Sequence, residues 1–167
     1  MHALYLLSVL LHILAATAWI GAMFFLMLIV VPMLRRGDRA QGAAFLSASG
    51  PRLRTMGWAS FAVLLLTGLY NLSRRGVHLE DLTRPDWVTS SFGHLVLLKL
   101  ALFVAVVGLS AIHDFRIGPN AARAVAKDPT SEEAQRLRRM ASIMGRANAL
   151  LALVIVAVAV MLVRGAP

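Results

Sequence analysis

Four long apolar runs dominate this sequence of 167 residues and restrict what it can fold into. They cover about residues 4–34, 55–72, 92–112 and 147–163. A helix needs roughly 20 apolar residues to cross about 30 Å of hydrocarbon. The composition, with 59% hydrophobic residues and a mean hydropathy of +0.73, is too apolar for a soluble domain of this length. We therefore expect an integral membrane protein whose main partner is the lipid bilayer.

Helices, rather than strands, are expected to cross the membrane, because the sequence lacks the polar–apolar alternation of a membrane β-barrel. We predict an all-α fold, a single domain over residues 1–167 that forms a four-transmembrane-helix bundle. Its helices are expected at about 4–34, 55–72, 88–115 and 142–164, with short interfacial helices in the cytoplasmic loops. Pro51 is expected to interrupt the first of these loop segments, and Asp128-Pro129 to divide the last. Ser131 or Thr130 is a predicted helix start.

Charge in the loops predicts the orientation. The loops around residues 35–54 and 114–139 carry an excess of arginine and lysine, whereas the middle loop is balanced. Positively charged loops stay on the cytoplasmic side, so both termini are expected outside. The first run lacks a basic start and is too long for a signal peptide, which indicates a retained helix. The net charge of +9 is thus a topology signal, and the chain lacks the basic–aromatic pattern that nucleic-acid binding requires.

Two ionisable residues lie deep in apolar runs. Lys99 is in the middle of the third run, and His12 is at a similar depth in the first. An ionisable group at the bilayer centre costs about 2.5–3.5 kcal/mol on insertion scales, so it usually faces a functional interior. With the predicted orientation, His12, Lys99 and the shallower His94 all fall in the outer half of the bundle. The sequence therefore predicts a polar intramembrane site there.

The chain has no cysteine, which excludes disulfides and thiolate metal sites. A transition metal would have to bind histidine, methionine or carboxylate. His12, Trp19, Met23 and Met27 fall on one face of an ideal helix, at 100° per residue. Imidazole and thioether are suitable Cu(I) ligands. Copper could thus bind His12 and His94 and then pass along Met23 and Met27.

Several segments resemble the copper resistance protein D (CopD) family. They are residues 12–21, 31–36, 66–71, 91–102, 113–119 (HDFRIGP) and 161–165. This resemblance implies a bacterial inner (plasma) membrane protein involved in copper handling or transport. The chain differs from larger members of the family because it has four helices and no soluble copper-binding domain.

A second, more distant similarity is to HemJ-type protoporphyrinogen oxidases, which are four-helix proteins that bind b-type haem. It rests on the order of His12, Trp19 and then Lys99 in a Lys-Leu-Ala-Leu context. The similarity implies that His12 is an axial ligand of haem b and that Lys99 pairs with an anionic group. His94 would be a second ligand, and Trp19 would line the cofactor.

Three functions therefore stay open: copper handling, b-type haem binding with redox activity, and a cofactor-free structural subunit of a membrane complex. The copper interpretation is the one we adopt. An enzyme is the less favoured interpretation, and it would be a haem-dependent membrane oxidoreductase. We assign no catalytic residue. The sequence leaves open whether the chain forms a homodimer or joins a larger complex.

Overall fold

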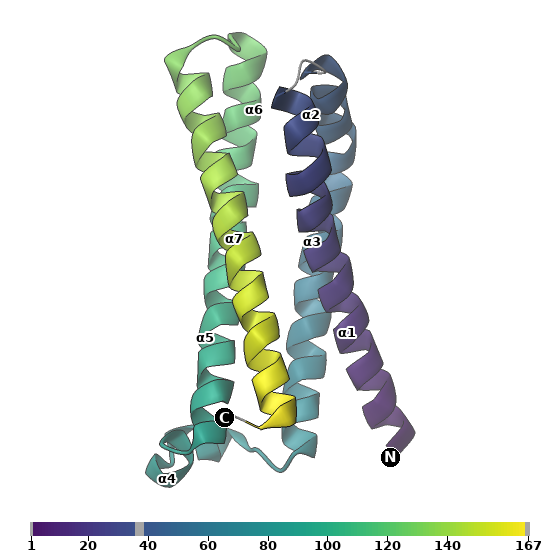
Figure 1. The fold of residues 1–167 in the computed structure, drawn as a ribbon, viewed down its shortest axis with the longest axis vertical. Coiled ribbons are helices and arrows are strands. Elements are labelled where there is room, and N and C mark those ends of the chain that lie inside the picture. Colours follow the sequence, from purple (N-terminus) through teal and green to yellow (C-terminus); the bar gives the residue numbers. More distant parts are fainter. Residues whose placement is uncertain (1, 36–38, 166–167) are drawn as a thin grey trace. The chain divides into compact units, whose positions relative to one another are not determined.

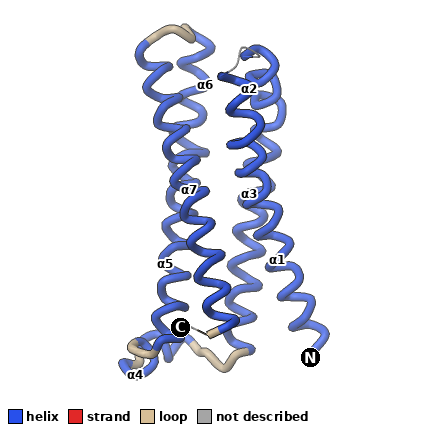
Figure 2. The backbone as a smooth tube through the Cα atoms, in the orientation of Figure 1, coloured by secondary structure: helices blue, strands red, loops and turns tan. Residues whose placement is uncertain are grey.

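The computed structural model describes the backbone of residues 2–35 and 39–165, and these residues are helical apart from short connections (Figures 1 and 2). The elements, in order, are α1 (His2–Phe25), η1 (Leu26–Val30), α2 (Val31–Arg35), α3 (Arg39–Arg74), η2 (Leu79–Thr83), α4 (Pro85–Val88), α5 (Ser91–Ile112), η3 (His113–Ile117), α6 (Gly118–Lys127) and α7 (Glu132–Arg164). Of these, η1 and η3 are π-helical turns and η2 is a 3₁₀ helix.

Four helical segments are long and apolar enough to cross a membrane: His2–Met33, Ala48–Arg74, Ser91–Lys127 and Glu132–Arg164. Each of them overlaps one of the four predicted spans, so the all-α fold class with four membrane-spanning helices is confirmed. Their outward surfaces are largely apolar, as expected where lipid is the solvent. In hydrocarbon, each backbone polar group needs a partner within its own segment, and a helix provides this.

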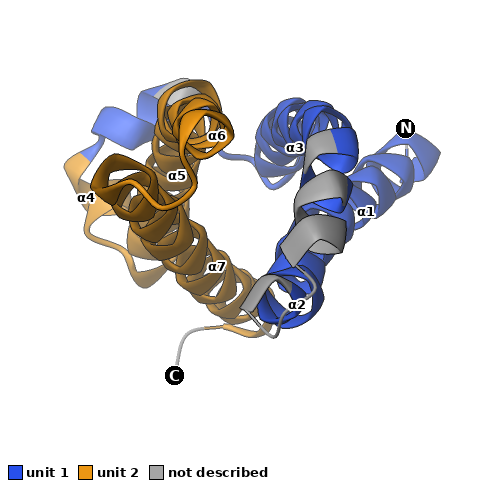
Figure 3. Ribbon diagram, turned by 90° about the horizontal axis from the view of Figure 1, so that it is seen from above, with its two compact units in different colours: residues 1–84 blue, residues 85–167 orange. Residues whose placement is uncertain are grey.

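The described chain divides into two compact units, residues 1–84 and 85–167, coloured separately in Figure 3. In the first unit α1, η1 and α2 run antiparallel to α3. In the second unit α5, η3 and α6 run antiparallel to α7. Each unit is therefore a helical hairpin that buries one face of each helix against its neighbour.

The two π-helical turns widen long helices without ending them. At η1 the Val31 backbone N–H donates to the Leu26 carbonyl, five residues earlier. At η3 the Gly118 N–H donates in the same way to the His113 carbonyl. Such turns occur frequently at functional sites, because they change the angular register of the side chains that follow.

The structure does not contain the separate interfacial helices that were expected in the described parts of the loops. Pro51 does not interrupt a helix, because α3 continues through it from Arg39 to Arg74. The predicted interfacial pieces are extensions of the spanning helices: α5 continues through η3 into α6, and α7 already begins at Glu132. In both helices the apolar stretch and the amphipathic stretch form one continuous helix, because successive turns continue the backbone hydrogen bonding.

The break between the last two helices was predicted correctly. Asp128 ends α6, and Ser131 is the N-cap of α7, accepting a hydrogen bond from the Ala134 N–H. The Thr130 side chain and backbone N–H both donate to the Asp128 carboxylate, at 2.6 and 2.8 Å. These bonds stabilise the ionised form and hold the pKa of Asp128 below its ordinary value.

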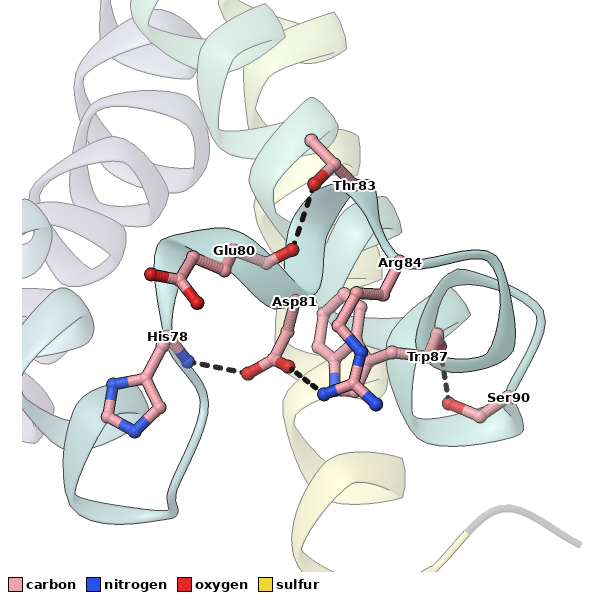
Figure 4. Close-up of polar contacts among 7 residues, drawn as sticks. All are labelled: His78, Glu80, Asp81, Thr83, Arg84, Trp87 and Ser90. Atoms are coloured by element: carbon pink, nitrogen blue, oxygen red, sulfur yellow. Dashed lines mark hydrogen bonds and ion pairs between the residues drawn. The ribbon is translucent and has the colours of Figure 1, made fainter.

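The connection between α3 and α5 is held by short-range polar contacts (Figure 4). The His78 backbone N–H donates to the Asp81 carboxylate at 2.8 Å, and Arg84 donates to the same carboxylate at 3.1 Å. The bond from His78, followed by the charge of Arg84, holds the pKa of Asp81 below its ordinary value. Further along, the Ser90 hydroxyl donates to the Trp87 carbonyl and accepts from the Gly93 N–H.

Gly93 is required where α5 begins. A Cβ atom at this position would lie 2.0 Å from the Trp87 carbonyl oxygen and 3.1 Å from Ser90 Oγ. The Trp87 carbonyl belongs to the backbone, so it cannot move away as a flexible side chain would. Glycine at this position thus lets α4 and the Ser90 cap approach the first turn of α5.

We predict that Gly93→Ala destabilises the protein by about 1–3 kcal/mol or more, because the added methyl overpacks a backbone contact. The measurement is the free energy of unfolding in detergent. Gly108→Ala is the matched control in the same helix, since a Cβ there meets nothing within 4 Å. Equal stability of the Gly93→Ala variant and the parent protein would contradict this account of the turn.

Candidate functional site

The first hairpin contains a polar contact inside its membrane-spanning part. His12 Nδ1 and Thr67 Oγ1 are 2.8 Å apart and join α1 to α3. His12 lies ten residues into α1, or about 15 Å from the start of the helix. A hydrogen bond between side chains of two membrane helices is a common way to satisfy polar groups in hydrocarbon. The structure thus gives the predicted His12 site a partner on the neighbouring helix.

The Thr67 hydroxyl also selects the tautomer of the neutral His12 ring. Thr67 Oγ1 donates its hydrogen to the Val63 carbonyl, one turn earlier in α3. The oxygen therefore meets His12 as an acceptor, and Nδ1 of the neutral ring carries the proton. Nε2 then carries the lone pair, which is the form of imidazole that ligates a metal.

The His12 ring lies beside Gly68 of α3 at this level. A Cβ atom on Gly68 would lie 3.4 Å from His12 Cε1, at the lower limit of ordinary van der Waals contact. Further along the hairpin, Trp19 is 7% exposed and packs edge-on against Phe61, with ring centroids 5.1 Å apart. Trp19, predicted from the sequence to line a cofactor, thus packs against α3 beside Gly57.

Met23 and Met27 lie further along the same segment, and both are half-buried. Met23 is 11 residues from His12, or about 16 Å along the axis, so the two cannot bind one ion together. Met27 lies within η1, and the wide π turn changes the register there. The α-helical spacing of 100° on which the predicted common face rests therefore extends past Met23 and ends two residues before Met27.

The remaining predicted ligands belong to the second hairpin. Lys99 is half-buried in α5, eight residues after its start. His94 is exposed in the first turn of α5, where its backbone N–H donates to the Ser90 carbonyl. His94 and Lys99 are thus on one helix of the second unit and His12 is in the first, so a site shared among them stays a prediction.

The second hairpin contains a polar pair of its own. Asn148 Nδ2 in α7 donates to Ser110 Oγ in α5 at 2.7 Å, and both residues are buried. One turn further along the chain, His113 Nδ1 lies 2.9 Å from the Asp114 carboxylate, within η3. Among the residues that the structure describes, no group of three or more His, Cys, Asp or Glu side chains could hold a metal ion.

Comparison with known proteins gives the family. A model of the family described as "Copper resistance protein D" matches residues 47–162, from the second half of the first hairpin to near the end of α7. The chain belongs to the copper resistance protein D family. An uncharacterized protein of Aquifex aeolicus (strain VF5) is 31% identical over 112 residues, which cover 66% of this chain and 68% of the relative. No solved structure matches the chain.

The CopD match includes Thr67, His94 and Lys99, whereas His12 lies before its first residue. The resemblance to this family seen in the sequence is therefore supported for residues 47–162. The similarity to HemJ-type protoporphyrinogen oxidases stays a prediction.

Several polar residues of this CopD-family chain were missed by the sequence analysis. They are Ser8, Thr67, Asn71 and Ser110. The sequence does contain a signal for two of them: Ser8 lies four residues before His12, and Asn71 lies four residues after Thr67. Polar residues one helical turn apart in an apolar run mark a single polar face. The sequence could not show that Thr67, rather than another residue, faces His12.

We predict that Thr67→Val lowers the free energy of unfolding by about 0.6 kcal/mol, and by no more than about 1.7 kcal/mol, the range of interhelical hydrogen bonds in membranes. Thr67→Ser keeps the hydroxyl oxygen and should retain most of the stability. The free energy of unfolding of both variants in mixed detergent micelles tests this. Full stability of Thr67→Val together with a loss in Thr67→Ser would mean that the methyl group rather than the hydrogen bond is important.

Proposed function

We propose that this chain is an inner-membrane protein that handles copper, and that His12 Nε2 is a copper ligand. Membership of the copper resistance protein D family supports a role connected with copper. The observation that carries the proposal for His12 is its 2.8 Å contact with Thr67. Histidines that bind metals typically give their other ring N–H to an oxygen of the protein, which fixes the tautomer and the ring orientation. His12 has this arrangement inside the membrane.

The chemistry of the proposed site favours Cu(I). The chain has no cysteine, so its candidate copper ligands are thioether groups, which are soft and suit Cu(I), and imidazole groups, which also bind copper. Met23 is too far from His12 to share one ion, so we propose that it is a separate binding position further along α1. Met27 would be the next position, within the π turn η1. In this proposal the copper ion is cargo that moves between weak positions, each with few ligands.

We propose the orientation indicated by the loop charges. The loops after the first and third spans contain most of the arginines and lysines, and such loops remain in the cytoplasm. Both termini then lie outside, and the start of α1 faces the outer side. His12 is therefore in the outer half of the membrane, and Met23 is nearer the cytoplasm.

We predict that His12→Ala lowers Cu(I) affinity by more than tenfold, because the change removes a ligand. Thr67→Val should weaken binding by about 10–100-fold, which is typical when the hydrogen-bond partner of a metal ligand is lost. The measurement is an anaerobic Cu(I) titration, in lipid nanodiscs, against a chromophoric chelator. His78→Ala, in the connection between α3 and α5, is the control and should bind as the parent does.

The result that would overturn the proposal is a His12→Ala variant that folds and binds Cu(I) as tightly as the parent protein. The visible spectrum of the same preparation tests the haem alternative. A Soret band with sharp reduced α and β bands, lost in His12→Ala, would replace copper handling by b-type haem binding. If the parent protein neither binds copper nor shows haem absorbance, the remaining interpretation is a cofactor-free structural subunit.

A further inference from the structure

The interface between α1 and α3 changes character along its length. Ser8, Ala15 and Trp19 of α1 are buried, and with His12 they repeat at intervals of three and four residues. This spacing places them on the face of α1 that meets α3, as the contacts of His12 and Trp19 show. We call this interface the α1–α3 seam.

The levels of residues in the seam follow from the antiparallel pairing. His12 contacts Thr67, so one turn towards the start of α1 corresponds to one turn towards the end of α3. Ser8 precedes His12 by four residues, and Asn71 follows Thr67 by four. Each is therefore displaced by about 6 Å from the His12–Thr67 pair, in the same direction. Ser8 and Asn71 consequently lie at one level, between His12 and the N-terminal end of the seam.

Both of these side chains contain a buried oxygen without a partner. In the described part of the chain three side-chain nitrogen or oxygen atoms are buried and lack a hydrogen bond: Ser8 Oγ, Asn71 Oδ1 and Asn148 Oδ1. Two of the three thus fall at the same level of one seam, one turn from His12. Ser8 is only 8% exposed. Buried polar atoms of native proteins are satisfied by protein groups or by bound water, and no described protein group bonds to these two oxygens.

The opposite direction along the seam is closed. Beyond His12 come Ala15 and then Trp19, which are 8% and 7% exposed. Trp19 packs against Phe61, which is itself 5% exposed and packs against Trp58. This part of the seam is filled by packed aromatic rings. Ser60 of α3 is also buried there, at 6% exposed, but it is not among the described residues with an unpartnered buried polar atom.

The course of α1 is consistent with water at the other end. Figures 1 and 3 show that α1 moves away from α3 towards its N-terminus, so the two backbones are furthest apart there. A water that bridges buried groups needs polar partners, and the oxygens of Ser8 and Asn71 supply two at this level.

We propose that water enters the α1–α3 seam from the N-terminal end of α1, is bound by Ser8 Oγ and Asn71 Oδ1, and reaches the His12 imidazole from that side only. His12 thereby has one-sided aqueous access. The consequence for copper, which rests on the proposed function, is that a hydrated ion reaches His12 from this end and not past Trp19. Ser8 and Asn71 are positioning residues that hold the water.

The absence of cysteine makes the proposal directly testable, because any introduced cysteine is the only thiol in the chain. Ser8→Cys replaces one small polar side chain by another and should fold. The cysteine thiolate attacks the sulfenyl sulfur of 2-aminoethyl methanethiosulfonate, which forms a mixed disulfide and releases methanesulfinate. The thiolate forms in water and not in an apolar seam. The protein is placed in lipid nanodiscs without copper, and the modified fraction is followed over time by intact mass.

We predict that Ser8→Cys reacts at least about tenfold faster than Ala15→Cys, since burial in an apolar environment raises a thiol pKa and removes thiolate. Ala15 is the matched control: it is on the same face of α1, two turns further along and equally buried, at 8% for both residues. Leu10→Cys, on the exposed surface of α1, reports access through lipid and should be slow. Asn71→Cys should react as Ser8→Cys does.

Folding of each variant is checked by its elution from a size-exclusion column. Equal rates for Ser8→Cys and Ala15→Cys in folded protein would overturn the one-sided access, whether both react slowly or both react quickly. Fast reaction of Leu10→Cys would also overturn it, since the reagent would then arrive through lipid. The experiment contains no copper, so its failure leaves the Cu(I) titration unaffected, and a failed titration leaves the hydration of the seam standing.

Discussion

The absence of water in the hydrocarbon of a bilayer is the constraint on which this structure depends. Backbone polar groups cannot find solvent there, so the chain crosses as helices that satisfy their own hydrogen bonds. The same constraint explains the continuity of the long helices. α3 passes through Pro51, and α5 continues through η3, because a break inside or near the membrane would leave backbone groups without partners.

Polar side chains face the same constraint, and they meet it between helices. Each hairpin contains a side-chain hydrogen bond that joins its two helices: His12 to Thr67 in the first, and Asn148 to Ser110 in the second. Such pairs fix which faces of the helices meet, because a slip of one residue would leave a polar group facing lipid. In the first hairpin the pair also fixes the tautomer of His12, which connects helix packing with the chemistry of the proposed copper site.

The α1–α3 seam suggests how a membrane protein can give a ligand access from one direction. Polar residues at one end and interlocked aromatic rings at the other divide the seam at His12. This asymmetry does not require a conformational change, because it arises from the order of residues along the face of α1 that meets α3. For the proposed copper site, this asymmetry would let an ion reach His12 from one end of the seam.

The sequence by itself determined the four spanning helices and the likeness to the CopD family, because apolar length and motif order are local properties. It also indicated His12 and Lys99, since an ionisable residue in an apolar run is conspicuous without any structure. Only the tertiary structure decided that Thr67 faces His12, that Trp19 packs against Phe61, and that the oxygens of Ser8 and Asn71 lie at one level. Those facts depend on how two helices pair, and the apolar face of one helix accepts many partners at similar energy, so the pairing could not be derived from either helix alone.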